Sequence, residues 1–218
     1  MRYFANPSTP AVRDAMRDGT LGMIATPKQG NRIPAGADWC ADNGCFGKGY
    51  PGDEAWIGWL ESYTAEERTR CAFAVAPDVV GDAKATIERS AEWLPRIRAL
   101  GYPAAFVAQN GAEHVGVPWD DFDVLFIGGD TEWKLGGHAR DIVAEARRRG
   151  KPVHMGRVNS RQRMRYASAI GCDSADGTYL AFGPDVNLPK LTGWVRDVNT
   201  APPLFDMYST DRPKETHR

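Results

Sequence analysis

Carboxylate and amide side chains recur where short apolar runs of the sequence end. Asp42, Asp78 and Gln109 each follow such a run, and Asp176 closes another. Carboxylates serve as nucleophiles and as proton donors or acceptors, and an amide hydrogen-bonds the polar edge of a substrate. If the runs are parallel strands of a barrel, the loops after them share one mouth. Three carboxylates and an amide on one rim predict an enzyme active site.

Each of these residues also has an ordinary structural interpretation. Asp42-Asn43-Gly44 and Gln109-Asn110-Gly111 are common turn sequences, and Asp78 is suited to cap a following helix. Met155 is of a type that usually fills a core. Separate turns do not account for several carboxylates at the ends of different strands, so we favour the joint site.

The apolar runs that would position these residues have the length and composition of β-strands. Helical patterns lie between most of them, which predicts a parallel sheet built from β–α units. The expected strands are Arg2–Ala5, Gly22–Thr26, Asp38–Ala41, Ala72–Ala76, Ala104–Ala108, Val124–Ile127, Val153–Met155 and a short one near Asp173–Ala175. The expected helices include Pro10–Asp18, Asp53–Tyr63, Asp82–Leu100 and one from Ser160 to Ile170.

Strands alternating with helices in this way predict the α/β class and a compact (β/α)₈ TIM-like barrel. The chain has 218 residues, fewer than the ~250 typical of this fold, so some helices must be abbreviated. We expect no helix between Asn110 and Asp123. An open doubly wound sheet is the alternative, but no Gly-x-Gly-x-x-Gly follows the first strand. We expect one domain over residues 1–200 and a poorly ordered tail over 201–218.

Composition excludes several classes of protein. With 42% hydrophobic and 25% charged residues, the chain can form one core and is neither disordered nor fibrous. No apolar stretch approaches the ~20 residues that span a bilayer, and no signal-peptide pattern opens the chain, so we expect a cytoplasmic location. The four cysteines have no paired spacing and predict neither a metal site nor disulfides.

The charge is unevenly distributed along the chain. A net charge of −1 argues against nonspecific coating of nucleic acid, which depends on phosphate neutralisation. Between Arg147 and Arg165, however, eight Lys or Arg residues occur with no Asp or Glu. This segment either faces solvent or contacts phosphates.

Five motifs occur in order between Asp38 and Thr178. They are Asp42-Asn43-Gly44-Cys45-Phe46, Asp78 after a strand, Val107-Ala108-Gln109-Asn110-Gly111, the turn Gly128-Gly129, and a pair formed by Lys151-Pro152-Val153-His154-Met155-Gly156 and Gly171-Cys172-Asp173-Ser174-Ala175-Asp176. Together they resemble the motifs of the queuine/archaeosine tRNA-guanine transglycosylase superfamily. Within it, the chain is most similar to the short DNA-modifying 7-deazaguanine transglycosylases of phages and bacterial genomic islands.

The resemblance implies a pentosyltransferase that replaces guanine in a nucleic acid by a 7-deazaguanine such as preQ0 or preQ1. Asp176 corresponds to the nucleophile that attacks the anomeric carbon, and Asp42 to the group that handles the proton of the departing and incoming bases. We expect no cofactor, and the cysteine spacing predicts no metal site. The base-binding residues that it implies are Asp78, Gln109, Gly128 and Gly129 at the polar edge and Phe46 and Met155 as walls.

Two departures from the family pattern favour DNA over tRNA as the substrate. No cysteine follows Asp176, so the zinc subdomain of the tRNA enzymes has no counterpart, and Gly177-Thr178-Tyr179-Leu180 replaces their Pro-Thr-Arg element. The expected partner is therefore DNA, in the host cytoplasm if the gene belongs to a phage. A base in a duplex must leave the stack, at a cost of roughly 2–5 kcal/mol. Arg157, Arg161 and Arg163 are the candidates for holding the backbone meanwhile.

Three other functions are consistent with the same residues. The first is the same exchange on tRNA. The second is an N-glycosidase or nucleosidase, in which water replaces the incoming base. The third is a degenerate barrel that binds nucleic acid or a partner without catalysis.

Overall fold

Parallel strands form a closed barrel in the computed structural model, which describes residues 1–47 and 49–200. In this part of the chain the eight strands follow one another around the barrel, and β8 pairs with β1 to close it. The strands are β1 (Arg2–Ala5), β2 (Gly22–Ala25), β3 (Trp39–Ala41), β4 (Cys71–Val75), β5 (Ala104–Ala108), β6 (Val124–Ile127), β7 (Val153–Met155) and β8 (Ser174–Asp176). The predicted (β/α)₈ barrel is thereby confirmed.

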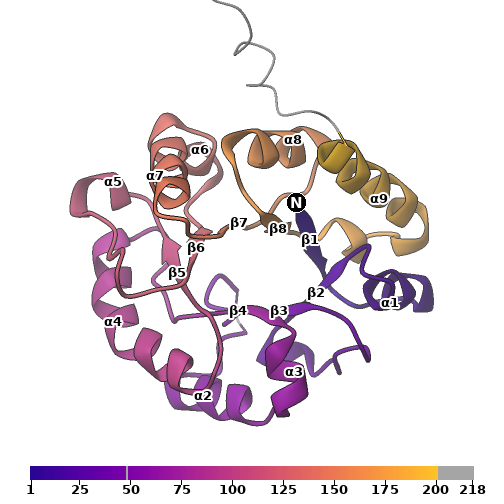
Figure 1. Cartoon of the computed structure of the whole chain (residues 1–218), viewed down its shortest axis with the longest axis horizontal. Helices are drawn as coiled ribbons and strands as arrows, with labels where there is room; N and C mark the ends of the chain where they lie inside the picture. The colour runs from indigo at the N-terminus through magenta and orange to yellow at the C-terminus, as the bar shows by residue number, and fades with distance from the viewer. Residues whose placement is uncertain (48, 201–218) are drawn as a thin grey trace, which may run out of the picture.

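Helices surround the barrel as an outer ring (Figure 1). The α-helices of the described part are α1 (Pro10–Arg17), α2 (Asp53–Glu61), α3 (Ala65–Thr69), α4 (Ala83–Ala99), α5 (Ala112–Val115), α6 (Thr131–Lys134), α7 (Gly137–Arg148), α8 (Arg161–Ile170) and α9 (Pro184–Thr200). Two 3₁₀ turns, η1 (Pro27–Gln29) and η2 (Tyr179–Ala181), follow β2 and β8. None of the helices described combines the length and apolarity needed to cross a bilayer.

The expected strands agree with the observed ones to within one residue at each end. Helix starts are also as expected: Asp82 caps α4 by accepting a hydrogen bond from the Ala85 N–H, and Ser160 caps α8. Asp78 caps no helix in the described residues, because the chain runs on as a turn to Asp82. The predicted tail over 201–218 lies outside the described residues.

The expectation of no helix between residues 110 and 123 is wrong. The helix α5 forms a single turn between Gly111 and Gly116, both of which have positive φ. A four-residue helix has no apolar periodicity from which it could be predicted.

Two apolar layers position the strands. One lies between the barrel and the helices and contains most of the buried side chains. The other fills the barrel interior, and its members alternate along the strands with those of the first layer. The interior layer consists of Phe4, Ile24, Cys40, Phe73, Val75, Ala105, Val107 and Val124, with Phe126 packed against it.

Candidate active site

One cavity of about 210 Å³ lies at the mouth of the barrel, where the carboxyl ends of the strands meet. Its lining follows from the alternation of side chains along a strand, because the residue two positions beyond an inward one also faces inward. Val107 in the interior is thus followed by Gln109 in the lining, and Phe126 is followed by Gly128. The cavity is the upper layer of the barrel interior, where carboxylate and amide side chains join apolar ones.

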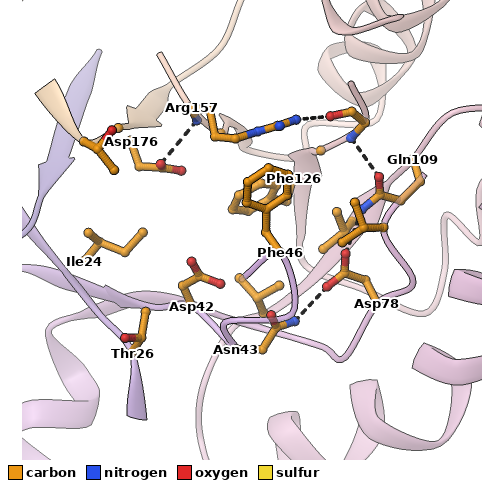
Figure 2. A pocket seen from close by; sticks show the side chains of 18 of the residues that line it. Ile24, Thr26, Asp42, Asn43, Phe46, Asp78, Gln109, Phe126, Arg157 and Asp176 are labelled. Atoms are coloured by element: carbon orange, nitrogen blue, oxygen red, sulfur yellow. Dashed lines mark hydrogen bonds between the residues drawn. The ribbon is translucent and has the colours of Figure 1, made fainter. Parts of the chain in front are cut away.

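Most of the predicted site residues line this cavity, and Figure 2 shows how they converge there from different strands. Met155, Arg161 and Arg163 do not line it. The predicted residues in the lining are Asp42, Phe46, Asp78, Gln109, Gly128, Gly129, Arg157 and Asp176.

Asp176 ends β8 and is 9% exposed. Its Oδ1 accepts a hydrogen bond from the backbone N–H of Arg157 at 3.2 Å, and its Oδ2 lies 2.9 Å from Nε2 of His154. The backbone N–H of Val158 also donates to the carbonyl of Asp176, which ties the loop after β7 to β8. The carboxylate is therefore held in one orientation at the cavity wall.

The turn at Gly156 and Arg157 holds this contact in place. Arg157 is the one non-glycine residue with positive φ, 61°, among the described residues. Such a backbone conformation is uncommon and persists only where surrounding contacts impose it. One such contact comes from Lys134, which is buried and donates from Nζ to the Gly156 carbonyl at 2.7 Å. Burial, together with the charge of Arg157, lowers the pKa of Lys134 to about 7.

Asp42 follows β3 and accepts a hydrogen bond from the backbone N–H of Gly44 at 3.0 Å. Burial raises the pKa of its carboxyl from 3.8 to about 7, and the nearby charges of Asp176 and Asp78 add to the rise. A carboxyl with such a pKa can both donate and accept a proton near neutral pH.

Asp78 belongs to a hydrogen-bonded network of amides. Asn43 donates from Nδ2 to Oδ1 of Asp78 at 3.0 Å, and Gln109 donates from Nε2 to Oδ2 at 2.7 Å. The Oε1 of Gln109 in turn accepts from the N–H groups of Gly129 and Gly81. Burial raises the pKa of Asp78, although the two amide donors oppose the rise. The network fixes which edge of Asp78 and Gln109 faces the cavity.

Aromatic rings form part of the cavity wall. Phe46 is 62% exposed at the rim, and the guanidinium carbon of Arg157 lies 4.1 Å from its ring centroid. Phe126 lies deeper, on β6, and also lines the cavity.

The prediction that Met155 forms a wall of the base site is not supported. Met155 is fully buried in the layer between the barrel and the helices. It lies beside Ala175 in the β7–β8 register, whereas His154 lies beside Ser174 and faces the interior. Adjacent residues of a strand point to opposite faces, so an inward His154 directs Met155 outward. Phe126 lies in the wall instead.

Arg161 and Arg163 are outside the cavity, on the helix that follows its rim. Arg161 pairs with Asp197 of α9, and Arg163 donates to the carbonyl of Arg157 at 3.4 Å. Arg163 also lines a separate groove together with Tyr166. The role of both arginines in binding a nucleic-acid backbone stays a prediction.

Two glycines adjoin Asp176 and leave no space for a side chain. A Cβ on Gly156 would lie 2.8 Å from a ring carbon of Phe126 and 3.4 Å from Oδ2 of Asp176. A Cβ on Gly177 would lie 2.3 Å from the side-chain oxygen of Asn159. Contacts this short force the neighbours to move, and a close-packed interior resists such movement.

Sequence reasoning missed four residues that build the site. Each of them contacts a predicted residue or lines the cavity, and only the strand alternation could have indicated two of them, His154 and Phe126. The four are Asn43, Phe126, Lys134 and His154. Within the described ranges, no cluster of three or more His, Cys, Asp or Glu side chains is suited to hold a metal ion.

No protein-family model and no curated protein sequence matches the chain. A chain in the crystal structure of the Amycolatopsis orientalis BexX/CysO complex superposes with a TM-score of 0.51 at 13% identity, over 99% of this chain and 94% of that chain. The 3-hexulose-6-phosphate synthase of Salmonella typhimurium gives a TM-score of 0.47 at 12% identity, over 91% of this chain and 100% of that one. At 13% identity, the first superposition shows a shared fold alone. The fold and site together define a (β/α)₈-barrel protein with a carboxylate-lined cavity at its mouth.

Proposed function

We propose that the chain is a base-exchange transglycosylase, a pentosyltransferase that replaces guanine in DNA by a 7-deazaguanine of the preQ0 or preQ1 type. The observation that carries the proposal is the pairing of two carboxyl groups in unlike surroundings within one cavity. Asp176 accepts a backbone N–H and adjoins a histidine, whereas burial raises the pKa of Asp42 to about 7. Two carboxyl groups in unlike environments are typical of sites that divide nucleophilic and acid–base work.

The reaction would proceed by two displacements at the anomeric carbon. In the first, an oxygen of Asp176 forms a bond to C1′ as the bond from C1′ to N9 of guanine breaks, and Asp42 gives its proton to the departing base. In the second, the ionised Asp42 takes a proton from the incoming base, whose nitrogen attacks C1′ and releases Asp176. Each step inverts the anomeric carbon, so the overall exchange retains its configuration.

The cavity suits a single planar base. Its volume of about 210 Å³ is below the ~300–1,000 Å³ of pockets that enclose drug-sized ligands. Asp78 and Gln109 offer acceptor and donor groups on one side, and Phe46 and Phe126 offer aromatic surface. Aromatic faces favour flat ring systems, and fixed polar groups select among them.

DNA is proposed as the polymer because Gly177-Thr178-Tyr179-Leu180 replaces the Pro-Thr-Arg element of the tRNA enzymes. The cations around the mouth are consistent with a phosphate backbone. Arg157 lines the cavity, and Arg163 lies on the helix that follows.

The test is incorporation of labelled guanine or preQ0 into duplex DNA, with tRNA as a parallel acceptor. Wild-type protein is expected to label DNA, and Asp176→Asn to lose at least about 10³-fold in rate. A matched control is Asp173→Asn, because Asp173 directly precedes β8, pairs with Arg147 and is expected to retain exchange.

Other outcomes select other functions. Labelling of tRNA alone would select the RNA enzyme. Release of free guanine without an added base would select a hydrolase. Full activity of Asp176→Asn would refute the proposed mechanism.

A further inference from the structure

We propose that His154 is a positioning residue that holds one oxygen of Asp176 and leaves the other for attack. The proposal deepens the function proposed above and rests on it. His154 is the middle residue of β7 and is 0% exposed. It does not line the cavity, so it can act on a substrate only through Asp176.

The surroundings of His154 give its ring two polar partners and apolar neighbours elsewhere. The imidazole centroid lies 4.6 Å from that of Phe126 and 4.9 Å from that of Phe73. Its Nε2 is 2.9 Å from Oδ2 of Asp176, and its Nδ1 is 2.9 Å from the Ser174 hydroxyl. Both ring nitrogens are therefore satisfied, and the aromatic rings restrict the imidazole to this orientation.

The chemistry of the two partners determines which nitrogen carries the proton. An ionised carboxylate only accepts hydrogen bonds, so Nε2 must be the donor toward Asp176. A hydroxyl both donates and accepts, so Ser174 can donate to an unprotonated Nδ1. The resulting chain runs from the Ser174 hydroxyl through His154 to Oδ2 of Asp176. With Nε2 as the donor, the imidazole fixes the orientation of the carboxylate.

The contact divides the two oxygens of Asp176 by role. Oδ2 is directed toward a residue behind the cavity wall, and Oδ1 is held by the backbone N–H of Arg157 at 3.2 Å. Oδ1 accepts this one N–H and keeps a lone pair for the bond to C1′, while Oδ2 becomes the carbonyl oxygen of the ester and keeps its hydrogen bond to Nε2. No proton leaves His154 in either step, because the proton of the base is exchanged with Asp42. A fixed nucleophile raises the fraction of complexes in attack geometry.

Three variants test the kinetic part of the proposal. His154→Leu removes the donor and is expected to lower kcat for exchange about 10- to 100-fold, the range for one hydrogen bond to a charged group, with little change in KM for the base. His154→Gln keeps an N–H donor near the position of Nε2 and is expected to recover most of the loss. Ser174→Ala is expected to fall between wild type and His154→Leu.

Thermal unfolding of each variant separates positioning from simple packing. If His154→Gln is as slow as His154→Leu although both are folded, the hydrogen bond to Asp176 does not position the nucleophile. A rise in KM at unchanged kcat would likewise overturn the proposal.

The tautomer of His154 is tested by a measurement that does not depend on catalysis. Nitrogen-15 NMR of the histidine side chains, with the His154 signals assigned by their loss in His154→Gln, is expected to show the proton on Nε2. Asp176→Asn is expected to shift these signals, because the partner of Nε2 changes. An Nε2 without a proton, or no response to Asp176→Asn, would overturn the assigned contact. If wild-type protein exchanges no base, the proposed function fails, and this experiment still decides the contact.

Discussion

Arg157 stacks on Phe46 at the rim of the cavity, with 4.1 Å between the guanidinium carbon and the ring centroid. The same guanidinium donates a hydrogen bond to the carbonyl of Gly129 (Figure 2). A planar cation thus makes the two kinds of contact proposed for a purine, stacking on an aromatic ring and hydrogen bonding at Gly129. If a base stacks on the same face of Phe46, it displaces this guanidinium.

Replacing Arg157 by Ala is therefore expected to tighten binding of free guanine or preQ0 and to weaken binding of DNA. The variant keeps the backbone N–H that Asp176 accepts. Without the stack of Arg157 on Phe46, the Kd for the base is expected to fall roughly 2- to 5-fold. Calorimetry with base and with a DNA duplex measures both effects. Arg161→Ala is the control, since Arg161 pairs with Asp197 outside the cavity, and it is expected to leave base affinity unchanged.

The pH dependence of exchange is expected to follow Asp42. Burial raises the pKa of this carboxyl to about 7, so the group is protonated below that pH and ionised above it. Departure of guanine needs the protonated form, and the rate of the first displacement is therefore expected to fall as pH rises through about 7. Asp42→Asn is expected to be slower by about 10²–10⁴-fold and to lose this limb of the profile. If the fall in rate with rising pH persists in Asp42→Asn, it belongs to the titration of another group.

Asp42 is also expected to make stability depend on pH. Its pKa is higher in the folded protein, about 7, than the ordinary value of 3.8, so the folded state binds the proton more tightly. Stability from this group is complete below pH 3.8 and declines as pH rises to about 7. Asp42→Asn removes this loss, and its Tm relative to wild type is expected to be higher at pH 8 than at pH 5. Equal differences at the two pH values would contradict the raised pKa.

The stability of the hydrogen-bonded network around Asp78 is expected to depend on each donor facing an acceptor. In Asp78→Asn, one of the donors from Asn43 and Gln109 meets an N–H instead of an oxygen. Leaving a buried donor unpaired costs about 1–3 kcal/mol, which urea unfolding can measure. The double variant Asp78→Asn with Gln109→Glu reverses the donor and acceptor between these positions. It is expected to regain stability but not affinity for the base, whereas recovery of both would argue against specific recognition by Asp78.

Affinity for the base is expected to respond to substitution of Phe126 and not to substitution of Met155. Phe126 lines the cavity, whereas Met155 lies in the outer layer. Phe126→Leu is expected to weaken binding of the base about 2- to 10-fold through lost stacking, and Met155→Leu to leave it unchanged. Both are conservative core substitutions, so a comparison of base Kd at equal folded fraction isolates the wall. A larger effect at Met155 would contradict the observed orientation of β7.

The strands could be predicted from sequence because each is a short apolar run between turn residues. The barrel followed from their number and from the helical patterns between them. The single-turn helices α5 and α6 could not be predicted in this way, since a helix of four residues shows no periodicity. The long helix α9 was not among the expected helices, and its internal Pro189 is a residue that sequence reasoning takes as a helix breaker.

Only the site residues that lie at strand ends or in the family motifs could be predicted from the sequence. Asp42, Asp78 and Asp176 each lie at or just beyond the end of a strand, and the barrel brings such ends together. The orientation of Met155 could be predicted only from the alternation of side chains along β7, and a sequence motif gives no information on that alternation. The contact between His154 and Asp176 depends on β7–β8 register and is visible only in three dimensions.

The glycines at 156 and 177 make the corner around Asp176 intolerant of mutation. Neither position can acquire even a methyl group without displacing Phe126 or Asn159. In a library randomised at both codons and selected for function, glycine should be the residue recovered at each. The orientation of the Asp176 carboxylate thus depends on the absence of side chains at residues 156 and 177 as much as on the side chains that contact it, and a designer who transfers this arrangement to another barrel must copy both.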